Sequence, residues 1–389
     1  MMEMTLTRWW NNKRFRHLLI QVILVGFILA GFFFFSTNTI VNLRRLGVPV
    51  GLDFLSNVAG FPVATSLIPI PVDASNGYLL LVGIINTFTV SIISVVIATV
   101  VGFIVGIARL SPNPLFTLLA TTYVESLRNI PLLLFIVFWY FGVLASLPAL
   151  RQSLSFGDVL FLNQRGLFLP RPIALPGSTG FLLIMAIAIL GVIALAVWVR
   201  RRQALTGRLF PFWSTAGGTL LGALVLALLV FGRPLHLEYP QLQGFNFQGG
   251  FVILPELLAL CAALGLYHAA YIAENVRSGF LSIGKGQWEA ATSLGLRRGA
   301  ILRLIAIPQA MRVIVPPLSN QFLNVVKNST LAVAIGYPEM VSIFAGTVLN
   351  QTGRAIECIF ITMLFYLIVS LVITSFTNWY NRRVQVVER

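Results

Sequence analysis

The chain has few charged residues and few side chains of the kinds that build metal or disulfide sites. Only 10% of its 389 residues are Asp, Glu, Lys or Arg, against about 25% in a typical soluble domain. Its two cysteines and three histidines are scattered, which excludes a zinc-type spacing and a disulfide framework. No nucleophile is paired with a base in a recognisable motif, so nothing in the sequence supports an enzyme.

Apolar residues, by contrast, make up 57% of the chain, and the mean hydropathy is +0.88. Runs of about 20 apolar residues predict membrane-spanning helices, and the fold class expected is an all-α integral membrane protein. The first run is too long for a cleaved secretory signal and is expected to remain as a span. The eight predicted spans are Leu18–Phe35, Leu79–Ala108, Leu115–Leu147, Phe181–Val199, Phe212–Phe231, Leu254–Asn275, Val313–Gly336 and Ile356–Thr377.

The net charge of +15 follows the predicted topology and does not require a nucleic-acid partner. With the N-terminus inside the cell, 18 of the 27 Lys and Arg residues lie on cytosolic segments and six lie outside. This excess obeys the positive-inside rule. Both termini, including a tail at 381–389, are therefore expected in the cytosol.

The predicted spans fall into a core and an insertion. Residues 1–78 are expected to form one span and an ordered external segment, in which Pro and Gly alternate with apolar residues. Residues 79–380 form the main transmembrane domain, interrupted at about 148–253 by an external segment and a helix hairpin. The hairpin is expected to turn at Arg200–Arg202 and to pack through the small residues of Gly218–Gly222.

Polar residues inside the core spans are the candidates for a transport path, because such groups are costly in a bilayer. One set recurs at helical spacing on one face: Asn320, Asn324, Lys327 and Asn328. Asn86 and Thr87 are further candidates. Lys327 could recognise a carboxylate of the substrate or pair with a buried acid such as Glu339. Glu125 with Arg128, and Glu274 with Arg277, have the i, i+3 spacing of intrahelical ion pairs.

A loop at about 278–310 has the features of a docking site. Trp288, Ala291, Leu294 and Gly295 would line one side of a short helix. Small residues there would let a partner backbone approach closely, and Glu289 could pair with or cap a neighbour. The alternative is an interfacial helix lying on lipid, which usually carries more aromatic and basic residues.

The same loop also contains Gly279–Gly286, with the glycines and lysine of a phosphate-binding loop. It ends in Gly286 where Ser or Thr must contact magnesium, and it follows a membrane span in place of a strand. The chain itself is therefore expected to bind no ATP.

Several motifs resemble the polar amino-acid permeases of ATP-binding-cassette (ABC) importers. One, Tyr123–Leu133, is close to the family pattern Tyr-x-Glu-x-x-Arg-x-x-Pro-Leu-Leu, although Asn129-Ile130 replaces the commoner Gly-Thr. The first span, the external Gly51–Leu55 and the extra hairpin are similar to the larger permeases of general L-amino acid and glutamate/glutamine/aspartate systems. The other matching segments are Tyr271–Gly279, Gly286–Ala291, Leu294–Leu296, Pro308–Ala310 and Asn320–Phe322.

The resemblance implies the type I ABC importer transmembrane fold in a bacterial inner membrane. It implies import of L-amino acids by a pair of identical or related permeases, two cytosolic ATPases that hold ATP and magnesium, and an extracytoplasmic binding protein. The coupling residues would be Glu289, Ala290, Ala291, Leu294, Gly295 and Leu296. A secondary amino-acid transporter driven by an ion gradient is the alternative, and it would need no docking helix.

Overall fold

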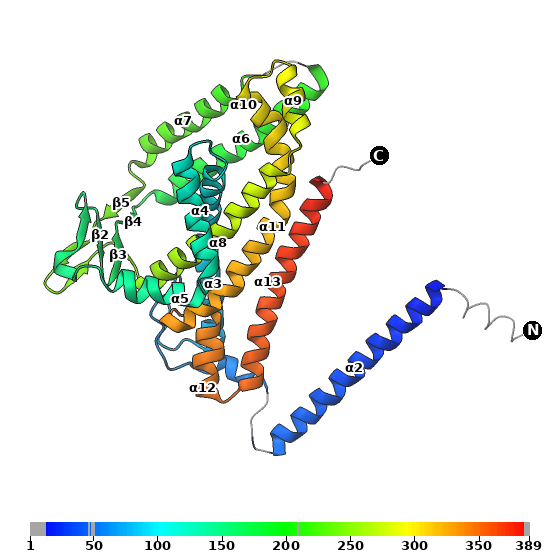
Figure 1. Ribbon diagram of the computed structural model, residues 1–389. Helices are drawn as coiled ribbons and strands as arrows, with labels where there is room; N and C mark the ends of the chain where they lie inside the picture. The colour runs from blue at the N-terminus through cyan, green and yellow to red at the C-terminus, as the bar shows by residue number, and fades with distance from the viewer. Residues whose placement is uncertain (1–12, 46, 48–50, 208–209, 385–389) are drawn as a thin grey trace, which may run out of the picture. The chain divides into compact units, whose positions relative to one another are not determined.

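The computed structural model describes residues 13–45, 47, 51–207 and 210–384 (Figure 1). Expectations for residues 1–12, 208 and 385–389, which include part of the charge count and of the C-terminal tail, lie outside the described residues. The chain divides into two compact units: Met1–Ile136 with Leu260–Arg389, and Val137–Ala259.

Helices dominate the first unit (Figure 1). Two of them, α3 and α4, begin at a side-chain cap. Ser75 caps α3 by accepting a hydrogen bond from the backbone N–H of Tyr78, and Asn113 caps α4, with Pro114 in its first turn. The helices are α2 (Lys13–Arg45), α3 (Asn76–Ala108), α4 (Pro114–Asn129), α5 (Leu132–Val137), α8 (Pro255–Leu281), α9 (Lys285–Ser293), α10 (Arg298–Ile301), α11 (Ile307–Asn328), α12 (Leu349–Thr352) and α13 (Ala355–Val384). Shorter segments of this unit are the 3-10 helices η1 (Asp53–Ser56) and η5 (Ser329–Ile335) and the π-helices η4 (Leu302–Ala306) and η6 (Val341–Val348). The π-helix η2 (Phe138–Leu144) and the 3-10 helix η3 (Leu150–Gln152) belong to the second unit.

Among the described residues, seven helices are long and apolar enough to cross a membrane, or eight if one bent pair counts as a span. The bent pair is α4 with Leu132–Leu144, and the chain turns by 110° between them. The predicted span Leu115–Leu147 is therefore not one continuous helix. Pro131 is the reason, because it disfavours helical backbone at the residue before it, and Ile130 is extended, with ψ 133°.

Glycines bring α3 and α8 into close contact. A Cβ atom added at Gly102 would lie 2.6 Å from an Ile272 side-chain atom, and one added at Gly106 would lie 2.7 Å from Val276. The GxxxG spacing of these two glycines permits this approach. A side chain at Gly218 or Gly222 would meet nothing within 4 Å, so the small-residue packing face predicted in the hairpin makes no such contact there.

Residues 51–75, which precede α3, pack against the rest of the first unit. Phe54 of η1 is buried in a cluster with Leu79, Phe344 and Cys358. The backbone N–H of Gly51 donates to Glu357 at 2.8 Å. This segment is therefore fastened to the start of α13.

The second unit combines the helix hairpin with short strands that the sequence does not predict. α6 (Ser178–Thr206) and α7 (Phe212–Phe231) form the hairpin. Arg200–Arg202 lie inside α6, and the helix ends at Gly207, whose φ is +67°, so the turn is not where it was expected.

The strands of the second unit are antiparallel and only three or four residues long, too short for an alternating pattern to be recognised. Phe161, Phe168 and Phe247 pack together between them. The four-stranded sheet has the order β1 (Leu154–Phe156), β2 (Leu160–Asn163), β3 (Gly166–Leu169), β8 (Phe251–Ile253). β4 (Arg171–Ala174) pairs with β5 (Leu235–Glu238), and β6 (Gln241–Gln243) pairs with β7 (Asn246–Gln248).

Candidate functional site

The predicted docking loop contains a nine-residue helix, α9, with a well-defined end. The N–H of Leu296 donates to the carbonyl of Ala291 at 3.3 Å, and the N–H of Gly295 donates to Thr292 at 2.9 Å. These two bonds form a Schellman motif, in which the residue after the helix is left-handed. Gly295 has a φ of +70°, so the backbone conformation itself favours glycine at this position.

The predicted docking face of α9 is divided between the interior and the surface. Ala291 is 1% exposed and Trp288 packs against a core cluster, whereas Leu294 is 78% exposed. Glu289 and Ala290 are also exposed. Trp288 and Ala291 therefore hold the helix to the rest of the chain. The exposed residues Glu289, Ala290 and Leu294 form an edge that a partner can reach, which we call the outer edge of α9.

Core contacts join α9 to α8 and α11. Ile283, between α8 and α9, lies in one cluster with Ala310 and Ile314 of α11. A Cβ atom at Gly279 of α8 would lie 2.4 Å from an Ile314 side-chain atom. Because these contacts are tight, a displacement of α9 would be transmitted to both spans.

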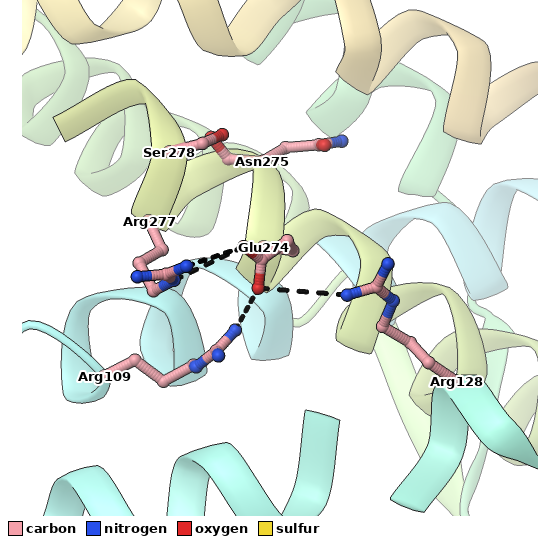
Figure 2. Close-up of polar contacts among 6 residues, drawn as sticks. All are labelled: Arg109, Arg128, Glu274, Asn275, Arg277 and Ser278. Carbon is pink, nitrogen blue, oxygen red and sulfur yellow. Dashed lines mark hydrogen bonds and ion pairs between the residues drawn. The ribbon is translucent and has the colours of Figure 1, made fainter. Parts of the chain in front are cut away.

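An ionic cluster centred on Glu274 connects three helices (Figure 2). Arg277, one turn along α8, lies 3.0 Å from the Glu274 carboxylate, so this predicted i, i+3 pair is confirmed. Arg109, at the end of α3, contacts the same carboxylate. Arg128 of α4 approaches it to 4.0 Å and lies over the Tyr271 ring, 5.6 Å from the ring centroid.

The predicted pair between Glu125 and Arg128 is absent from the described ion pairs. Glu125 is exposed, and the Arg128 guanidinium is directed at Glu274 instead (Figure 2). The carboxylate of Glu274 attracts Arg128 across the helix boundary, because it is more enclosed than that of Glu125 and a less hydrated charge interacts more strongly. One carboxylate thus receives three guanidinium groups, and this cluster fastens α3 and α4 to α8.

The polar stripe of α11 is also divided. Asn320, Asn324 and Lys327 are exposed and share one helical face. Asn328 turns inward, where its side-chain amide donates to Nε2 of His268 at 3.1 Å. The other ring nitrogen of His268 lies 3.1 Å from the Gln321 side-chain oxygen. Because Nε2 accepts, Nδ1 carries the proton and donates to Gln321.

His268 and Gln321 are polar residues of the spans that sequence reasoning did not single out as candidates. His268 is 2% exposed and bridges α8 to α11 through side chains 53 and 60 residues away. The only available signal was an ionisable residue within a predicted span. Its partners are too distant in sequence for spacing to indicate them.

Asn86 and Thr87 are buried among the described residues, and their place on a transport path stays a prediction. Asn86 donates to the carbonyls of Thr65 and Pro338, both at 2.8 Å. Thr87 accepts the backbone N–H of Met340 at 3.1 Å. Both residues therefore join α3 to the segment before η6.

Glu339 is not the partner of Lys327. Its buried carboxylate accepts the backbone N–H groups of Val341 and Ser342, at 2.9 and 2.8 Å, and the hydroxyl of Tyr366 at 3.0 Å. The N–H groups of Val341 and Ser342 lie in the first turn of η6, where backbone donors have no partner inside the helix. Lys327 is left with its ammonium group on the exposed face of α11.

Comparison with known proteins places these features in a family. Residues 223–386 match the family described as "Binding-protein-dependent transport system inner membrane component". The chain is 47% identical to YhdX of Escherichia coli (strain K12), named as an amino-acid ABC transporter permease, over 97% of this chain and 96% of YhdX. It is 44% identical to the general L-amino acid transport system permease protein AapQ of Rhizobium johnstonii, over 96% and 92%. It is 39% identical to the glutamate/glutamine/aspartate/asparagine transport system permease protein BztB of Rhodobacter capsulatus, over 97% and 96%.

Proposed function

Since the chain belongs to the family of amino-acid ABC transporter permeases, we propose that the outer edge of α9 is the surface that a separate ATPase subunit receives. The chain is a transport permease with the transmembrane fold of type I ABC importers. What supports the docking role is the division of α9. Its inner side is anchored by Trp288 and Ala291, while Leu294 is left 78% exposed by the residues that the structure describes.

The proposed assembly contains two permeases, identical or related, two ATPases and an extracytoplasmic binding protein. ATP and magnesium would be held by the ATPases. The outer edge of α9 and the chain termini would lie in the cytosol, in accordance with the positive-inside distribution of Lys and Arg. The cargo would be L-amino acids, either polar and acidic ones or a broad range.

Closure of the ATPase pair would move α9, and the packed contacts of Ile283 and Gly279 would carry that movement into α8 and α11. The exposed face of α11, with Asn320, Asn324 and Lys327, would line the path that opens alternately to each side. The Glu274 cluster would keep α3 and α4 moving together with α8.

The experiment that tests this proposal uses the complete transporter in liposomes and replaces Leu294, the most exposed apolar residue of the outer edge. Leu294→Glu should abolish ATP-driven uptake and reduce ATPase stimulation by the binding protein, because a buried unpaired charge would oppose docking. Leu205→Glu is the matched control, since Leu205, at the end of α6, is 86% exposed. Normal uptake by Leu294→Glu would contradict the docking role.

The ion-gradient alternative is addressed in the same liposomes. Uptake should require ATP on the side of the vesicle membrane where the ATPases lie. It should be insensitive to an imposed proton or sodium gradient. Uptake that persists without ATP while an ion gradient is present would favour the secondary transporter.

A further inference from the structure

A groove of about 870 Å³ runs along the inner side of α9, within the first unit. Its walls are mainly apolar and come from the end of α3, the start of α4, the end of α8 and the segment from α9 to α11. They include Ile104, Ile107, Phe116, Leu281 and Trp288. The residues of the outer edge of α9 are not among its walls, so a partner docked on that edge would leave the groove unfilled.

Two cations lie among the groove's lining residues, Lys285 at the start of α9 and Arg298 at the start of α10. No Asp or Glu lines it. Among the described residues, neither Lys285 nor Arg298 takes part in an ion pair. The groove therefore combines apolar walls with an uncompensated positive charge.

The apolar walls continue onto the surface that faces outward from the spans. Ile104, Phe116 and Leu281 are 63%, 55% and 60% exposed, and they sit within one to three turns of the ends of α3, α4 and α8. Exposed apolar residues on spanning helices face acyl chains. The groove is thus open to lipid near the ends of α3, α4 and α8, where Lys285 and Arg298 also lie.

We propose that this groove binds an anionic phospholipid, with an acyl chain against Ile104 and Leu281 and the phosphate at Lys285 and Arg298. Basic pockets between transmembrane helices at the cytosolic boundary recognise such headgroups. The proposal rests on the proposed function only for the side of the membrane on which the groove lies. That function places the groove, and therefore the lipid, in the cytosolic leaflet. A lipid held there would support Trp288, so coupling through α9 would depend on the anionic lipid content of the membrane.

The test measures lipid binding to the purified complete transporter, with fluorescent phosphatidylglycerol and phosphatidylcholine as probes. The wild type should bind phosphatidylglycerol more tightly than phosphatidylcholine. Lys285→Gln and Arg298→Gln should each weaken phosphatidylglycerol binding about fivefold, and the double variant about 25-fold. The matched control removes two neighbouring exposed charges that do not line the groove, Arg297→Gln with Arg303→Gln, and should leave binding within about twofold.

A second variant fills the groove without changing charge. Ala108→Phe, in the wall contributed by α3, should weaken binding of both lipids, because it competes with the acyl chain. Inorganic phosphate alone should fail to displace the lipid at concentrations where phosphatidylglycerol does. Displacement by inorganic phosphate would overturn the lipid assignment in favour of a free anion site.

The functional readout is binding-protein-stimulated ATPase activity in vesicles of phosphatidylcholine with and without phosphatidylglycerol. The wild type should be more active with phosphatidylglycerol, and the Lys285→Gln, Arg298→Gln double variant should lose that difference. Equal binding of the two lipids by the wild type, or a groove occupied by a second copy of the chain in cross-linking, would overturn the proposal. Because Leu294→Glu should still bind phosphatidylglycerol, its result separates failure of the docking role from failure of the lipid site.

Discussion

Gly106→Ala and Gly222→Ala place the same methyl group into two helices with the same small-xxx-small spacing, and the structure predicts opposite results. At Gly106 the new Cβ would lie 2.7 Å from Cβ of Val276 and 2.8 Å from the carbonyl oxygen of Ala273. Ordinary contact begins at 3.4 Å, so α8 would have to retreat by about 0.7 Å. At Gly222 the new Cβ meets nothing within 4 Å.

The magnitude follows from two opposing terms. Alanine is favoured over glycine in a helix interior by about 1 kcal/mol, and this gain applies at both positions. Overpacking costs about 1 to 3 kcal/mol, and it applies only at Gly106, where one of the contacts is backbone and cannot rotate away. Gly222→Ala should therefore be neutral or stabilising by up to about 1 kcal/mol, and Gly106→Ala should be less stable than Gly222→Ala by about 1 to 3 kcal/mol.

The assay is the apparent Tm of the purified permease in one detergent, together with ATP-driven uptake in liposomes. Gly106→Ala should have a lower Tm than Gly222→Ala, and Gly106→Leu should give little folded protein, while Gly222→Leu should fold normally. If Gly106→Leu folded and transported as well as Gly222→Leu, the close approach of α3 and α8 described above would be wrong.

Three further predictions concern the ends of α9, the ionic cluster and the exposed face of α11. Gly295→Ala should lower the apparent Tm or the uptake rate by an amount equivalent to about 1 to 2 kcal/mol, because the φ of Gly295 is +70°. The control Gly284→Ala should have little effect, because the φ of Gly284 is −59°. Equal effects of the two substitutions would contradict the Schellman motif at the end of α9. Glu274→Gln should lower the Tm. The loss of stability should be smaller than the roughly 3 to 5 kcal/mol typical of breaking a fully buried pair, because Glu274 is 27% exposed. An unchanged Tm would show that the three arginines do not need this carboxylate. Asn324→Cys should react with a membrane-impermeant thiol reagent in at least one nucleotide state and the buried Asn86→Cys should not, as measured by mass shift; the reverse order would remove α11 from the path.

The helical spans and the family were predictable because both depend on local patterns. Apolar runs of about 20 residues, and the breaking effect of Pro131, act within a few residues of themselves. The short helix α9 was predictable for the same reason, since its apolar spacing and Gly295 lie within one short stretch. Its division into an inner side and an outer edge was not, because the inner side is set by Trp288, which packs against a cluster that includes Ala306 and Ala310.

What the amino-acid sequence by itself determined was a multi-spanning permease with a short helix at 285–293, a polar stripe on α11 and the Glu274–Arg277 pair. Only the tertiary structure decided that Arg128 joins Glu274, that Asn86 is buried, and that Gly106 rather than Gly222 lies at a close helix contact. The physical reason is the separation along the sequence between the residues that interact. Helical spacing specifies which residues share a face, but charge pairing and burial depend on the helix that covers that face, and for Arg109 and Glu274 that helix is 165 residues away.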